Sequence, residues 1–130
     1  MNKARNMERT ILIIEDEKLI IVSTQMVLEA AGFHVESATS GEEGIQKARS
    51  SAPDLILLDI MMPGIDGWET LNRLKRDNST ADIPVIIFTA REHSRGHQKS
   101  SEMGAAEYFR KPFEPDELIE LVEKHVSQRD

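Results

Sequence analysis

Residues that can do chemistry follow four separate apolar segments of this chain. They are Glu15, Asp16 and Glu17 after residues 11–14, Asp59 after 55–58, Thr89 after 85–88, and Lys111 shortly after 106–109. Crowded carboxylates repel one another and need a cation, and oxygen ligands without cysteine favour a hard ion such as Mg²⁺. An aspartate beside Mg²⁺ can act as a nucleophile toward a phosphoryl group, while a lysine and a hydroxyl would hold the equatorial phosphoryl oxygens.

Five short segments predict the strands that must position these residues. Three of them are continuous apolar runs, typical of strands buried on both faces, whereas residues 33–38 alternate as a half-exposed strand does. The five segments are residues 11–14, 33–38, 55–58, 85–88 and 106–109.

Amphipathic stretches between these strands predict helices over residues 18–31, about 41–50, 66–77 and from Pro115 onward. In the first helix we expect a core-facing apolar stripe formed by Leu19, Val22, Met26, Val27 and Ala30. At the second, Ser40 is a candidate N-cap, and Glu43 is its candidate capping-box partner.

The segment from Arg91 to Gly104 offers the weakest helical pattern. Met103 is its only large apolar residue, and Gly96 costs a helix about 1 kcal/mol relative to alanine. Since packing of an apolar face supplies most helical stability, we expect this helix to be short, irregular or mobile.

Strands that alternate with helices predict an α/β fold, with a doubly wound parallel sheet of five strands covered by five helices. Ligands of such sheets bind just beyond the carboxyl ends of the strands. The acidic residues, the hydroxyl and the lysine are therefore expected to converge at one edge of the sheet.

Composition narrows the class of protein further. The 130 residues carry 16 basic and 23 acidic side chains, a net charge of −7 that disfavours direct nucleic-acid binding. Without cysteine there are no disulfides and no thiolate chemistry, and no apolar stretch is long enough for a membrane span. We expect a cytoplasmic protein with a flexible tail over residues 1–9 and one domain over 10–128, which has no membrane contact.

Four motifs in order resemble the receiver domains of the response regulators of two-component signalling. They are ILIIEDE at 11–17, LILLDIMMPGIDGWE at 55–69, PVIIFTA at 84–90 and EYFRKPF at 107–113. The resemblance covers about residues 10–127 and implies a flavodoxin-like fold with strand order 2-1-3-4-5. It also implies a phosphorylation switch rather than an enzyme, with only self-phosphorylation and slow self-dephosphorylation.

The resemblance assigns roles to individual residues. Asp59 would accept the phosphoryl group of a phosphohistidine, supplied by a histidine kinase or a histidine phosphotransfer protein. The implied Mg²⁺ ligands are Glu15, Asp16, Asp59 and the backbone carbonyl of Met61. Lys111 would pair with Asp59 or its phosphate, and the Lys111–Pro112 bond would be cis. Thr89 and Tyr108 would be the switch residues that alter a face bound by a downstream protein target or output domain.

Three other functions are weaker readings of the same residues. A phosphohydrolase with an aspartyl nucleophile typically has a second aspartate where this chain has Met61. A flavodoxin would bind its flavin phosphate in the loop where Glu15 to Glu17 would repel it. A scaffold that is not phosphorylated is disfavoured because all five motif residues are present. The leading hypothesis is a signalling domain with no output domain within these 130 residues, either a stand-alone regulator or a piece of a longer protein.

Overall fold

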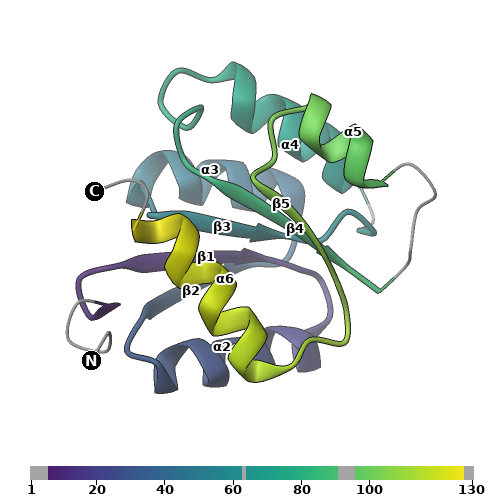
Figure 1. The fold of residues 1–130 in the computed structure, drawn as a ribbon. Helices are drawn as coiled ribbons and strands as arrows, with labels where there is room; N and C mark the ends of the chain where they lie inside the picture. The colour runs from purple at the N-terminus through teal and green to yellow at the C-terminus, as the bar shows by residue number, and fades with distance from the viewer. Residues whose placement is uncertain (1–5, 63, 91–95, 128–130) are drawn as a thin grey trace.

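The computed structural model describes residues 6–62, 64–90 and 96–127. Its five parallel strands form one sheet in the order β2-β1-β3-β4-β5 (Figure 1), which confirms the predicted flavodoxin-like fold and strand order. The strands are β1 (Thr10–Ile14), β2 (His34–Ala38), β3 (Leu55–Leu58), β4 (Val85–Thr89) and β5 (Glu107–Arg110).

Five helices cover the two faces of the sheet in the part of the chain that the structure describes. They are α2 (Lys18–Ala30), α3 (Gly41–Ser51), α4 (Gly67–Arg76), α5 (Gly96–Glu102) and α6 (Pro115–Ser127). Helices α2 and α6 lie on one face, and α3, α4 and α5 lie on the other (Figure 1). None of these helices is long and apolar enough to cross a membrane.

Two hydrophobic cores result because successive side chains of each strand point to opposite faces. In β1, Ile11 and Ile13 pack with α2 and α6, whereas Leu12 and Ile14 pack with α3 and α4. All four are fully buried, and each such side chain contributes roughly 1.5–3 kcal/mol by leaving water. The continuous apolar runs in the sequence are the consequence of this two-sided burial.

The predicted core-facing stripe of α2 is wrong. Leu19, Val22 and Met26 are 82%, 52% and 65% exposed, and Ala30 is also exposed. The residues that face the sheet are instead Ile21, Thr24 and Leu28, with Val27 packed at the margin of the core. The error has a physical cause: apolar residues occupy more than one side of this helix, so its sequence allows two stripes, and tertiary packing selects one.

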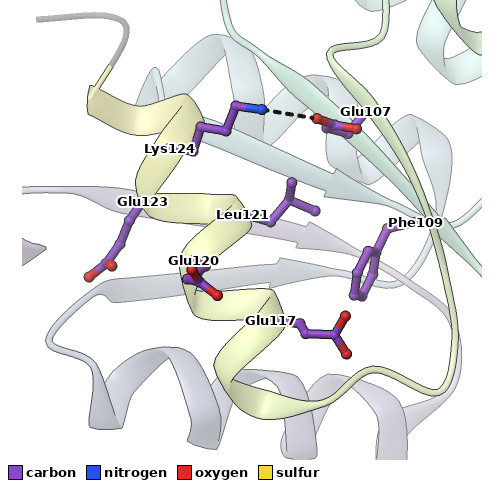
Figure 2. Close-up of a pocket in the computed structure, with 7 residues that line it drawn as sticks. All are labelled: Glu107, Phe109, Glu117, Glu120, Leu121, Glu123 and Lys124. Atoms are coloured by element: carbon purple, nitrogen blue, oxygen red, sulfur yellow. Dashed lines mark ion pairs between the residues drawn. The ribbon is translucent and has the colours of Figure 1, made fainter.

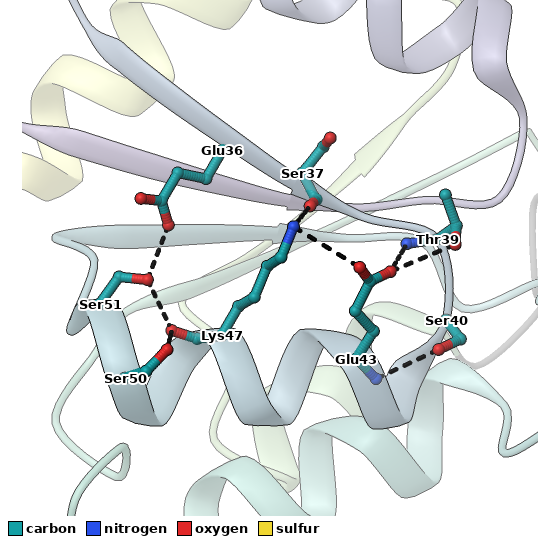
Figure 3. Close-up of polar contacts among 8 residues, drawn as sticks. All are labelled: Glu36, Ser37, Thr39, Ser40, Glu43, Lys47, Ser50 and Ser51. Carbon is teal, nitrogen blue, oxygen red and sulfur yellow. Dashed lines mark hydrogen bonds and ion pairs between the residues drawn. The ribbon is translucent and has the colours of Figure 1, made fainter.

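The start of α3 agrees with the predicted cap in part. The Ser40 hydroxyl accepts a hydrogen bond from the Glu43 N–H at 3.1 Å, but the Glu43 carboxylate accepts from the N–H of Thr39 rather than that of Ser40 (Figure 3). On the same helix, the Lys47 ammonium donates to the backbone carbonyl of Ser37 on β2 (Figure 3). These contacts fasten α3 to the strand that precedes it.

Two predicted features lie partly outside the described residues. Of the segment 91–104, residues 91–95 are outside, and α5 occupies seven residues, fewer than any other described helix. Of the predicted tail, residues 1–5 are outside, while Asn6 is buried. The Asn6 amide donates to the Ala31 carbonyl and to Glu123, each at 2.9 Å, so it joins the end of α2 to α6.

Candidate functional site

Three carboxylates meet where β1 and β3 end. These strands are hydrogen-bonded neighbours with Ile14 opposite Leu58, so the residues that follow them are brought together. Carboxylate oxygens of Glu15, Asp16 and Asp59 all lie within 4.8 Å of one another. Glu15 and Asp59 are buried, whereas Asp16 is exposed to solvent. This donor set of oxygens fits a hard divalent cation, as the sequence predicted.

Lys111 reaches this cluster from the end of β5. Its ammonium donates to Oε1 of Glu15 and lies 3.6 Å from Oδ2 of Asp59. The Lys111 ammonium also lies 4.6 Å from the centroid of the Phe88 ring. The backbone N–H of Lys111 donates to the Thr89 carbonyl at 2.8 Å. The Lys111–Pro112 peptide bond is cis, as the resemblance implies.

Burial governs the electrostatics of Glu15. Loss of solvent raises the pKa of this carboxyl from 4.5 to about 6, although the hydrogen bonds from Lys111 and from the Glu17 N–H act in the opposite direction, and the nearby Asp59 charge adds to the increase. A bound cation would favour the ionised carboxylate. The site thus favours binding of positive charge near neutral pH.

The loop after β3 holds Asp59 in place. Oδ1 of Asp59 accepts the N–H of Met61 at 3.0 Å, and the Asp59 N–H donates to the Ile14 carbonyl. Gly67, the first residue of α4, packs directly on this loop: a Cβ there would lie 2.2 Å from Cα of Ile60. Coordination of a cation by the Met61 carbonyl stays a prediction, and the Met61 side chain is exposed beside the cluster.

The two predicted switch residues lie on neighbouring strands, β4 and β5. Thr89 is the last residue of β4 and is fully buried. Tyr108 pairs with Ile87 across the strands and is 7% exposed, with its ring in the core that also contains α4. The structure therefore holds the Tyr108 ring inside the molecule.

Two residues that contact the predicted site residues were not predicted from the sequence. Phe88 lies beneath the Lys111 ammonium, and Gly96 lies against the Tyr108 ring. Both contacts join residues of different helices, strands or loops, so no spacing in the sequence indicates them. For Gly96 the one available signal was a glycine inside a helical segment.

Two hollows adjoin β5 at different ends. A groove of about 630 Å³ lies beside the acidic cluster, between Ile20 and Val27 of α2 and the segment from Lys111 to Phe113. The other lies between the start of β5 and α6 and is lined by four glutamates, with Lys124 paired to Glu107 at 3.7 Å (Figure 2). Apart from Lys124 it offers no cation among its lining residues, whereas the acidic cluster combines a possible cation site with the Lys111 ammonium, and we take that cluster as the candidate site.

The fold and the cluster define a class of protein, and comparison with known families identifies it. Residues 11–123 match the model of the response regulator receiver domain, and the chain belongs to that family. The predicted resemblance is confirmed.

Particular relatives agree with this assignment. The chain is 40% identical to the phosphate regulon transcriptional regulatory protein PhoB of Escherichia coli over 95% of its length, and 38% identical to the DNA-binding dual master transcriptional regulator RpaA of Synechocystis over 92%. It spans 53% and 50% of those relatives, about half of their length. A CheY-like receiver domain from Methanospirillum hungatei superposes with a TM-score of 0.86 at 29% identity, covering 92% of this chain and 94% of its own.

Proposed function

We propose that this receiver domain accepts a phosphoryl group on Asp59, with Mg²⁺, from the phosphohistidine of a histidine kinase or a histidine phosphotransfer protein. The observation that carries the proposal is the meeting of Glu15, Asp59 and Lys111 from three different strand ends. One ammonium shared by two carboxylates leaves the cluster negatively charged, which suits a cation and then a phosphoryl group.

The residues divide the chemistry among them. An Asp59 oxygen forms a bond to phosphorus while the bond between phosphorus and the donor imidazole nitrogen breaks, and that nitrogen keeps the electron pair. Lys111 neutralises charge on the transferred oxygens. Glu15, Asp16, Asp59 and the Met61 carbonyl would hold the Mg²⁺, which supplies further neutralisation of phosphoryl charge when bound.

We infer that Thr89 and Tyr108 transmit the effect of phosphorylation to the partner-binding face. Thr89 ends β4, the strand next to β3, after which Asp59 comes, and Tyr108 lies on the neighbouring strand β5, two residues before the partner of Thr89. On this proposal Thr89 would contact the phosphoryl group on Asp59, and the face around α5, β5 and α6 would change for a downstream protein target or output domain. DNA binding is named for RpaA as a whole protein. For this domain we propose protein partners and no direct nucleic-acid contact, because its net charge is −7. A cytoplasmic location is proposed on composition alone.

The exposed apolar residues of α2 suggest where the donor protein docks. Helix α2 begins directly after Glu15 and Asp16, so Leu19, Val22 and Met26 are exposed on a helix that starts at the acidic cluster. The apolar groove between α2 and the segment after β5 is lined by other residues of the same helix, Ile20, Ser23 and Val27. A donor histidine must come into contact with Asp59, so we propose that apolar side chains of the donor cover this face of α2.

Phosphorylation in solution tests the proposal. The protein is incubated with acetyl phosphate and Mg²⁺, and intact mass is measured. One phosphoryl group is expected on the parent and on the control Asp82→Asn, whose carboxylate is exposed and outside the cluster, and none on Asp59→Asn. A phosphoryl group on Asp59→Asn would show that another residue is the acceptor.

A further inference from the structure

Gly96 occupies a place that leaves no room for a side chain. It is the first residue of α5, it is buried, and a Cβ built on it would lie 2.5 Å from both Cζ and the hydroxyl oxygen of Tyr108. Its φ is outside the left-handed region occupied by Gly32, Gly64 and Gly104. Backbone conformation therefore does not demand glycine here, and the space taken by the Tyr108 ring does.

We propose that Gly96 is the positioning residue for Tyr108, because its missing side chain forms the seat that holds the tyrosine ring inside the domain. Any residue larger than glycine would fill that seat and shift the ring toward solvent. The regulatory consequence rests on the function proposed above for Asp59 and Tyr108, while the steric relation between Gly96 and Tyr108 does not.

The ring is the partner that should yield, because turning the far end of one side chain costs less than displacing α5, whose average position is fixed by other contacts even if its backbone opens transiently. The Lys99 ammonium lies 4.5 Å from the centroid of the Trp68 ring on α4, and Met103, directly after α5, packs against the core. Ser100 is buried, and its carbonyl accepts the Ala105 N–H at 2.8 Å. The Tyr108 ring is instead the far end of a side chain on β5, an edge strand of the sheet, where rotation about χ1 leads outward.

Two positions of one ring make a two-state element, and residue 96 sets the balance between them. If phosphorylation favours the inward ring, then a change that disfavours the inward ring must weaken binding of the phosphoryl group or its mimic by the same factor. Glycine at 96 thus makes the switch easy to close. We expect Gly96→Ala to lower the affinity for beryllofluoride with Mg²⁺ by about tenfold, a typical size for such coupling.

Tyr108 is the only tyrosine in the chain, which gives a direct readout. The protein is labelled with 3-fluorotyrosine, and the ¹⁹F signal is measured with and without a soluble paramagnetic probe. In the parent the probe should broaden the signal little. In Gly96→Ala the signal should shift and broaden several-fold more. The control Ser101→Ala, an exposed position on the same helix, should behave as the parent does.

Each outcome of this experiment supports or contradicts the proposal for Gly96. A Tyr108 ring that stays as buried in Gly96→Ala as in the parent overturns the proposal, even if α5 has moved. If Gly96→Ala fails to fold, the double variant Gly96→Ala, Tyr108→Ala must fold, and its failure would show that the Tyr108 ring is not what residue 96 meets. Ring exposure is measured without phosphorylation, so absence of beryllofluoride binding by the parent would count against the proposed function and not against the steric relation.

Discussion

Lys111 donates a hydrogen bond to Glu15, a residue 96 positions earlier in the chain, and both side chains are at least nine-tenths buried. The pair lies beside Asp59, whose Oδ2 is 3.6 Å from the same ammonium. A buried ammonium shared in this way organises both carboxylates before any ligand arrives. Its removal should therefore affect stability and signalling together.

Lys111→Met keeps an apolar stem over Phe88 but removes the charge that two buried carboxylates share. Without Mg²⁺ the free energy of unfolding at pH 7 should fall by about 3 kcal/mol, and Mg²⁺ should restore part of it. Urea unfolding in EDTA and in Mg²⁺ measures both. Lys124→Met, at an exposed ion pair with Glu107, should cost less than about 1 kcal/mol. Equal losses in the two variants would contradict the role of the buried ammonium.

Glu15→Gln should change how stability depends on pH. The pKa of Glu15 is raised from 4.5 to about 6 in the folded protein, so the folded state binds this proton more tightly than the unfolded chain. The contribution of Glu15 to stability is present below pH 4.5 and is lost as the pH rises to about 6, a difference of roughly 2 kcal/mol. Urea unfolding in EDTA at several pH values should show this loss in the parent and not in Glu15→Gln. Parallel curves would refute it.

Thr24→Val should stabilise the protein by about 1 kcal/mol. Within the described residues, the buried Thr24 hydroxyl has no hydrogen-bond partner, and burying an unsatisfied polar group is costly. Thr80→Val is the matched control, because the equally buried Thr80 hydroxyl donates to the Leu74 carbonyl at 2.6 Å. That variant should lose about 1 kcal/mol. Thermal unfolding measures both, and a loss in both would count against the reading of Thr24.

Polar substitutions on the exposed face of α2 should separate docking from chemistry. Leu19→Ser and Met26→Ser should change stability by no more than about 0.5 kcal/mol, because both side chains are already in water. Phosphorylation by acetyl phosphate should be unchanged, while phosphotransfer from a donor protein should slow by about tenfold or more. Glu29→Ser, exposed near the end of the same helix, should leave both rates unchanged. Unaltered phosphotransfer in all three variants would place the donor elsewhere.

Amide exchange should be faster across residues 96–103 than across α2. Helix α5 has seven residues against thirteen in α2, and few of its side chains are apolar, so local opening should cost less free energy. Hydrogen exchange followed by NMR gives the comparison residue by residue. Protection in α5 equal to that in α2 would rule out the expected softness of this helix.

The sheet and the acidic cluster could be predicted because their causes are local. Strands buried on both faces need continuous apolar residues, and parallel strands bring their carboxyl ends to one edge. Glu15, Asp59 and Lys111 were thus expected to meet, and they do. The structure adds that the hydrogen bond of Lys111 goes to Glu15, a preference that depends on side-chain burial and not on sequence spacing.

Other features of the structure depend on which of several possible packing arrangements is the most stable. Both Leu19 and Ile21 lie on apolar sides of α2, and only contact with the sheet and α6 decides that Ile21 faces inward. The Glu43 carboxylate accepts from the N–H of Thr39, one residue before the predicted capping-box partner Ser40. The seat at Gly96 exists only because the Tyr108 ring points inward. Each of these outcomes is decided by tertiary packing, which the pattern of a single sequence does not determine.

The contact between Lys47 and Ser37 protects the open side of the sheet. Among the strands that the structure describes, β2 pairs only with β1, and the His34 N–H and the Ala38 carbonyl take part in that pairing. The carbonyl of Ser37 therefore faces outward, where a strand from another molecule could add to the sheet. Because the Lys47 ammonium already occupies this acceptor, a second copy would find this position of the edge blocked. Lys47 thus acts against edge-to-edge aggregation.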